Sequence, residues 1–561
     1  MRHLVICIWL LYALTTVGCD DTAGNADDSD VDANLLSPDA SRTDVFVVSL
    51  DQGATSDQTV STGDATLPSD AELNLPISED PIIEPEVSDD DVMRLNDAMP
   101  TTSCSPVTWR YPENDTIIPS RIRGLAFQWT GGTPPYRVTM RAGGQAYQWF
   151  VNDTSVSPEG AQWEIVQDLS RGQAPITVNV EHLIDSTTRC VSESLSVQVA
   201  EAELKGAVYY WSTTDSGIMR LPLGDNAPEL FLGPDLTADP PLNCPACHAL
   251  SKDGARMAFT NTTFPPFGNM SVIDTETPSQ QLYRANEDRN ANNVLDAGED
   301  LNANGQLDTV KGYFPSFAPD HRRVVAGAKG KLLIINSDDG QTLEELPIPA
   351  EQVAIHPDWS WQGDRIVGLL AAAGLESIFD DLPIPGIEID ISAQGVSDGS
   401  LAIWEEIDGV WGAPEVLIPP PAGDFNNGRP AFDPSGRWIA YQVSGPDSNP
   451  NDDLNSNQSL FITDSTLAMP TALTRANGIG EQGNNWPKWS PPTRSRYIWL
   501  AFSSLRPYGN VTSGGNPQIW ITAIDTLAEP GQDPSAPAFW LPGQAPGSGN
   551  HIPYWSVYEK L

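Results

Sequence analysis

The amino-acid sequence predicts an all-β fold in two parts, a β-sandwich followed by a six-bladed β-propeller. Three observations predict it: a composition rich in turn formers, with 45 Gly and 49 Pro, short runs in which apolar and polar residues alternate, and one motif that repeats along the second half of the chain. Hydrophobic residues make up 40% and tryptophans number 17, which excludes a wholly disordered chain. At 561 residues, the chain is longer than one domain usually is.

Residues 1–19 have the pattern of an export signal: a basic start, an apolar stretch and small residues before Cys19. The ending Thr16-Val17-Gly18-Cys19 resembles a bacterial lipobox. This resemblance implies that Cys19 is diacylated and becomes the mature N-terminus. Two acyl chains anchor a protein firmly to a membrane. Ordinary cleavage without a lipid is the alternative.

Residues 20–100 form an acidic segment, in which Asp and Glu outnumber Lys and Arg by 21 to 2 without any apolar periodicity. We expect a disordered, extended tether, because like charges repel one another and little apolar surface can be buried. The whole chain has a formal charge of −45 and a pI near 4.2. This charge repels phosphate backbones and excludes a nucleic-acid partner.

Residues 101–205 are predicted to form the β-sandwich. Runs at 125–129, 136–140 and 176–180 alternate apolar and polar residues between turn formers, which is typical of half-buried antiparallel strands. The number of such runs suggests a sandwich that resembles immunoglobulin and fibronectin-type domains. Cys104 and Cys190 lie near the two ends of this region. Because an exported chain meets an oxidising environment, we expect a disulfide between them.

Residues 206–561 contain the repeated motif. Its clearest copies are Pro357-Asp358-Trp359-Ser360, Pro430-Ala431-Phe432-Asp433 and Pro487-Lys488-Trp489-Ser490, and an apolar strand follows each of them after a turn. These copies resemble the repeats of TolB-like β-propellers. The resemblance covers about 350 residues and implies a TolB-like propeller fold.

Five full copies and a terminal half-copy at 553–556 indicate six blades, with seven as the alternative. The half-copy needs further strands, and the apolar run at 207–223 can supply them. We therefore expect both ends of this region to close the ring, which leaves no exposed sheet edge.

A possible cofactor site lies at the start of the first full copy, which begins at His248. Cys244-Pro245-Ala246-Cys247-His248 has the spacing of a c-type haem attachment motif, in which Cys244 and Cys247 bind the haem and His248 ligates the iron. The alternatives are a short disulfide or a buried thiol pair, with His248 merely capping a strand.

Residues 288–308 carry oxygen side chains in the order of calcium-binding loops, in two consecutive turns. The pair resembles the calcium loops of dockerins and thrombospondin-type repeats. The expected calcium ligands are Asp288, Asn290, Asn292, the backbone carbonyl of Val294, Asp296 and Glu299 in the first loop, and Asp300, Asn302, Asn304 and Asp308 in the second. A polar insertion without an ion is the alternative.

No motif predicts catalytic residues, since the sequence contains no Gly-x-Ser-x-Gly, His-Glu-x-x-His or phosphate-binding loop. We therefore expect a monomeric, non-catalytic cell-envelope lipoprotein whose propeller binds an unknown protein or glycan ligand. Membrane contact is expected through the lipid alone. Two alternatives remain: an electron-transfer protein with haem c, and an enzyme that acts on envelope glycans or peptides.

Overall fold

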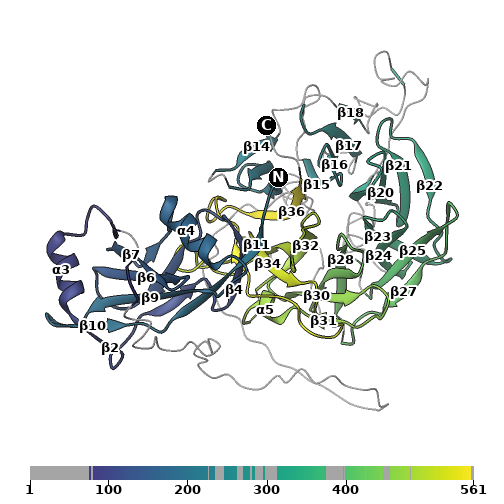
Figure 1. The fold of residues 1–561 in the computed structure, drawn as a ribbon. Coiled ribbons are helices and arrows are strands. Elements are labelled where there is room, and N and C mark those ends of the chain that lie inside the picture. Colours follow the sequence, from purple (N-terminus) through teal and green to yellow (C-terminus); the bar gives the residue numbers. More distant parts are fainter. Residues whose placement is uncertain are drawn as a thin grey trace, which may run out of the picture.

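The computed structural model describes most of the chain beyond the acidic segment. The described residues are 75–77, 80–224, 227–233, 245–261, 269–277, 281–284, 295–296, 312–373, 396, 398–423, 425–445, 455–480 and 482–557. Figure 1 shows an N-terminal domain, in purple and blue, beside a ring of sheets that runs from teal to yellow. Cys19 and the export signal lie outside the described residues.

An eight-stranded mixed sheet forms the main layer of the N-terminal domain. Its strands are β1 (Ile82–Ile83), β2 (Met99–Thr101), β4 (Thr116–Ser120), β6 (Tyr136–Ala142), β7 (Gln145–Val151), β9 (Ile176–Leu183), β10 (Thr188–Val191) and β11 (Leu195–Glu203). In the middle of this sheet, β6 is antiparallel to both β7 and β9. The apolar residues that predicted these strands, such as Val138 and Val178, are fully buried, but polar residues between them, such as Thr139 and Asn179, are buried as well, so the strands are not half-buried as expected.

A second, three-stranded sheet contains β3 (Thr108–Tyr111), β5 (Phe127–Thr130) and β8 (Ser155–Val156). Helix α4 (Gly160–Ser170), which the sequence analysis did not predict, contacts β6, β9 and β11. Its Trp163 packs edge-on against Phe127, and the indole N–H donates to the carbonyl of Ile122 at 2.9 Å. The helix thereby covers part of the core between the sheets.

The folded part begins before residue 101, the boundary expected from the sequence. Helix α3 (Asp89–Asp97) lies inside the acidic segment, and β1 and β2 flank it. Ser88 caps this helix, because its side chain accepts from the backbone N–H of Asp91, and three aspartates occupy the first turn, where the helix dipole favours negative charge. Leu95 is fully buried on the inner side. The prediction of a disordered tether was therefore wrong for this stretch, because its aspartates belong to the first turn of a helix.

A disulfide joins Cys104 to Cys190, with the two Cα atoms 5.8 Å apart. Strand β2 runs parallel to β10, and this pairing places Thr101 opposite Cys190. The disulfide therefore ties the segment that follows β2 to β10.

Beyond residue 206, the described residues form six sheets of consecutive antiparallel strands. In chain order, the sheets are β12 (Ala207–Ser212), β13 (Gly217–Pro222) and β14 (Glu229–Leu232), together with the terminal β36 (Asn550–Ser556); β15 (Pro245–Leu250), β16 (Arg256–Asn261), β17 (Asn269–Asp274) and β18 (Gln281–Arg284); β19 (Tyr313–Phe317), β20 (Arg323–Ala328), β21 (Lys331–Asn336) and β22 (Thr342–Glu345); β23 (Gln352–Trp359), β24 (Arg365–Ala372), β25 (Ser400–Ile407), β26 (Val410–Trp411) and β27 (Glu415–Ile418); β28 (Asn426–Phe432), β29 (Trp438–Ser444), β30 (Gln458–Asp464) and β31 (Thr471–Ala472); and β32 (Asn485–Trp489), β33 (Tyr497–Ser504), β34 (Gln518–Asp525) and β35 (Phe539–Trp540).

The inner strands of these sheets close a ring. Each of β15, β19, β23, β28, β32 and β36 contacts the next, and β36 contacts β15. The terminal β36 pairs antiparallel with β12, so that Val208 lies opposite Trp555. Gly206 has φ +90°, and a Cβ atom there would lie 1.8 Å from the carbonyl oxygen of Ser556. The two ends of the region therefore complete one sheet together, as the half-copy in the sequence predicted.

The N-terminal domain and the ring share one hydrophobic core. The hydroxyl of Tyr111 accepts from the backbone N–H of Trp540 at 3.0 Å, and Tyr508 stacks on Trp540 with ring centroids 4.1 Å apart. Asn510 donates its backbone N–H to Gln128 at 2.6 Å. Buried aromatic rings and hydrogen bonds thus hold the domain against the sheet that contains β34.

Candidate functional site in the central channel

The candidate site lies in the channel that the inner strands enclose. Every inner strand contains one residue in the left-handed region, with φ between 47° and 56°, where its register with the neighbouring strand shifts. These residues are Cys247, Phe314, His356, Arg429, Trp486 and Ile552. Such φ values are uncommon outside glycine, and a β-bulge can redirect a side chain. The first five of these residues line a cavity in the channel.

Large side chains fill this cavity almost completely. The guanidinium carbon of Arg429 lies 3.7 Å from the ring centroid of Trp486, and the rings of Phe314 and His356 meet edge-to-face at 4.3 Å. The remaining volume is about 20 Å³. These packed side chains, called the plug below, therefore leave little space in this part of the channel.

Asp358 joins neighbouring inner strands through its carboxylate. One oxygen accepts from the hydroxyl of Ser316 at 3.0 Å, and the other accepts from the backbone N–H of Phe432 at 2.8 Å. Both oxygens of the buried carboxylate are therefore used within the structure, on β19 and β28.

Lys488 faces Tyr554 on the terminal strand, with its Nζ atom 4.7 Å from the ring centroid. Burial works to lower the pKa of Lys488, but Tyr554 and Asp358 outweigh it, so that the pKa is raised. Lys488 is therefore protonated at neutral pH. A protonated amine cannot act as a nucleophile or a general base.

His248 and Cys247, two of the three residues of the predicted haem motif, lie on β15. His248 is buried beside Tyr554, with ring centroids 5.3 Å apart. Burial, together with the nearby His551 and Lys488, lowers the pKa of His248 to about 3, so that the imidazole is neutral. Neither ring nitrogen has a hydrogen-bond partner among the described residues.

A neutral imidazole can ligate a metal, but the space beside His248 is small and belongs to the same cavity of about 20 Å³. A haem does not fit there while the channel keeps this packing. Cys244 lies outside the described residues, so the thiol pair stays a prediction.

Of the predicted calcium ligands, only Asp296 falls within the described residues, and its side chain is exposed. The structure does not describe the others, so it brings no ligand set together. Within the ranges described above, no three His, Cys, Asp or Glu side chains are grouped to hold a metal ion. Calcium binding therefore stays a prediction.

The sequence did not predict a role for the channel-lining residues Phe314, His356, Arg429 and Trp486. A signal for them was present, because each directly precedes the proline that begins a copy of the motif. Residues before proline avoid the right-handed helical region, so the backbone at this position is restricted in each of these four copies. The sequence does not show that the side chain at this position faces the channel, so the signal could not be interpreted without the structure.

No family model matches the chain, and no curated protein matches it. Solved structures similar to it include TolB from Acinetobacter baumannii, with 13% identity and a TM-score of 0.37 over 68% of this chain and 80% of that chain. A protein described as a TolB from Agrobacterium tumefaciens has 12% identity and a TM-score of 0.29 over 61% of this chain and 89% of that chain. An oligogalacturonate lyase in complex with manganese has 14% identity and a TM-score of 0.28 over 50% of this chain and 61% of that chain.

The propeller predicted from the TolB-like repeats is confirmed by the closed ring of antiparallel sheets described above. In the described part of the chain, no helix has the length and apolar character needed to cross a membrane.

Proposed function

We propose that this chain is a non-catalytic binding or scaffold protein of the bacterial cell envelope. In this proposal, a lipid on Cys19 anchors the chain and the acidic segment separates the folded part from the membrane. A six-bladed propeller then acts as a rigid binding module for a protein or glycan. The six sheets among the described residues support the blade count. The two sheets of the N-terminal domain support the sandwich.

The observation that carries the proposal is the filled channel. Small-molecule sites usually have volumes of about 300–1,000 Å³, whereas the cavity among the inner-strand bulges has about 20 Å³. Its charged groups are engaged within the structure: Arg429 stacks on Trp486, and Asp358 accepts two hydrogen bonds. A rigid ring with a plugged centre supports binding on its outer faces better than chemistry inside it.

In-cell photo-crosslinking tests the proposal. A photoreactive amino acid is placed at the exposed Leu343 in β22, at the exposed Leu467 in the turn between β30 and β31, and at Met93 in the N-terminal domain as a comparison. We expect at least one propeller position to give a discrete adduct. We expect the same adduct when Trp486→Ala loosens the plug.

A second assay tests whether the chain is an enzyme, which would turn over a substrate. The purified full chain is incubated with oligogalacturonides and with peptides, with heat-denatured protein as the blank. Turnover above the blank that changes in Trp486→Ala would overturn the proposal, and so would the absence of adducts from both propeller positions.

A further inference from the structure

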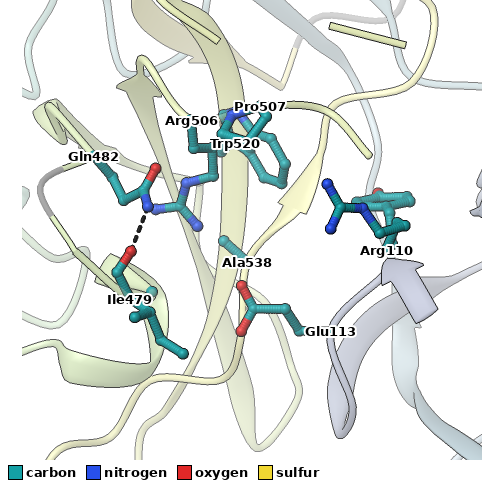
Figure 2. Close-up of a pocket in the computed structure, with 10 residues that line it drawn as sticks. Arg110, Glu113, Ile479, Gln482, Arg506, Pro507, Trp520 and Ala538 are labelled. Atoms are coloured by element: carbon teal, nitrogen blue, oxygen red, sulfur yellow. Dashed lines mark hydrogen bonds between the residues drawn. The ribbon is translucent and has the colours of Figure 1, made fainter. Parts of the chain in front are cut away.

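A separate cavity of about 140 Å³ lies where the N-terminal domain meets the ring. Arg110 and Glu113 line it from the N-terminal domain, and Arg506 and Trp520 line it from the sheet that contains β33 and β34. Figure 2 shows Glu113 between the guanidinium groups of Arg110 and Arg506. Two cations and one anion therefore surround the same space.

Arg506 carries an unsatisfied donor in this cavity. It is only 5% exposed, and its Nη2 atom donates to the carbonyls of Ala476 and Asn477 at the end of α5 (Thr474–Asn477). Its Nη1 atom has no hydrogen-bond partner among the described residues, and neither does the indole N–H of Trp520. Burial lowers the pKa of Arg506 to about 10, against the effect of Glu113, so that the group stays charged at neutral pH. A buried, unpaired N–H of a charged group is costly, and a ligand oxygen would satisfy it.

One point in the cavity lies close to both charges. An ideal Cβ atom built on Gly478 would be 3.6 Å from Nη1 of Arg506 and 3.7 Å from Oε1 of Glu113. A small molecule at this point can meet a guanidinium with one end and a carboxylate with the other. The apolar part of the cavity lining comes from Ile479, Pro507 and Ala538.

We propose that this cavity binds a small apolar α-amino acid, with its carboxylate on Arg506 and Arg110 and its ammonium group on Glu113. A cavity of about 150 Å³ can hold a benzene molecule, so the space suits a ligand of about six non-hydrogen atoms. Alanine has that size. A simple anion fits less well, because Glu113 would repel it. The site does not depend on the role proposed for the propeller faces, since it lies between the two domains.

Calorimetry on the full chain tests the site with L-alanine and with two matched probes, propionate without the ammonium group and ethylamine without the carboxylate. We expect saturable binding of alanine, with a Kd on the order of 1 mM for so small a ligand. Each probe should bind at least tenfold more weakly.

Two exposed side chains give variants that are expected to fold. Arg110→Gln should weaken alanine binding about tenfold. Glu113→Gln should weaken alanine binding about tenfold but leave propionate binding unchanged or stronger. Arg494→Gln, at the opposite end of β33, is the matched control and should bind alanine like the wild type. No saturable binding of alanine, propionate as strong as alanine, or alanine binding that neither Arg110→Gln nor Glu113→Gln alters would each overturn the proposal.

Discussion

The guanidinium of Arg365 donates to the carbonyl oxygen of Gly436 at 2.7 Å and thereby joins two neighbouring sheets of the ring. The same contact recurs elsewhere. Arg256 donates to the carbonyl of His321 at 3.2 Å, and Arg437 donates to that of Thr526 at 3.0 Å. In each case, an arginine that follows the turn of one copy reaches the next sheet. These arginines therefore connect successive blades at their turns.

Arg365→Ala should lower the free energy of unfolding by about 2 kcal/mol, because it removes charge-assisted hydrogen bonds to Gly436 and to the hydroxyl of Ser465. Denaturant unfolding measures this change. Arg496→Ala is the control, since it removes an exposed ion pair with Asp525 and should cost less than about 1 kcal/mol. Equal losses in the two variants would contradict a special role for the contact between sheets.

Ring closure predicts that Gly206→Ala is more damaging than Gly409→Ala. Both glycines have positive φ, +90° and +80°, but a Cβ at 206 meets the carbonyl of Ser556 whereas nothing lies within 4 Å of one at 409. Placing alanine at a positive φ therefore costs a similar free energy in both variants. Only Gly206→Ala also disturbs the pairing of β12 with β36. Deletion of residues 551–561 should lower the melting temperature at least as much. Unchanged melting after the deletion would disprove closure by the chain ends.

Burial of neutral His248 predicts acid sensitivity. Its pKa of about 3 in the folded state lies below the unfolded value of about 6.5, so its contribution to stability is complete above pH 6.5. That contribution is lost as the pH falls from 6.5 towards 3, at a rate of up to roughly 1.4 kcal/mol per pH unit. His248→Gln should reduce the slope of this part of the stability profile measured by urea unfolding without abolishing it, because burial also lowers the pKa of His356. His321→Gln, at a half-exposed position, serves as the comparison. A wild-type profile without a slope in this range would count against the prediction.

The haem prediction is tested in a strain that is shown to mature other c-type cytochromes. Thioether attachment at Cys244 and Cys247 predicts a haem stain that persists after denaturation, and Cys247→Ser should weaken it. A colourless protein whose mass is lower by two hydrogens at this pair would establish the disulfide instead. The packing beside His248 favours a colourless protein.

Calcium binding by residues 288–308 is expected to be modest, with a Kd of roughly 10⁻⁵ to 10⁻³ M as in extracellular modules. The combined variant Asp296→Asn and Glu299→Gln removes two of the three carboxylates of the first loop and should abolish most binding there. Calorimetry provides the measurement. Absence of calcium heat in the wild type, or full binding by the variant, would leave a polar insertion without an ion.

The repeated motif determined the propeller from sequence alone, because its pattern is local. A proline, an aromatic residue, a turn and an apolar strand occupy fixed positions in the clearest copies, and the terminal half-copy required a partner strand elsewhere. The N-terminal boundary and helix α3 could not be predicted in this way. The three aspartates at 89–91 look like tether residues until the burial of Leu95 shows that they begin a helix.

Only the tertiary structure decided how the centre of the ring and the junction between the domains are filled. Arg429 and Trp486 lie 57 positions apart in the sequence and come into contact because the ring brings their bulges together. Glu113 and Arg506 belong to different domains and line one cavity. Sequence patterns report which residues a strand buries, since that depends on neighbours two positions away. They do not report which buried side chains meet, because strand order and ring closure fix those contacts.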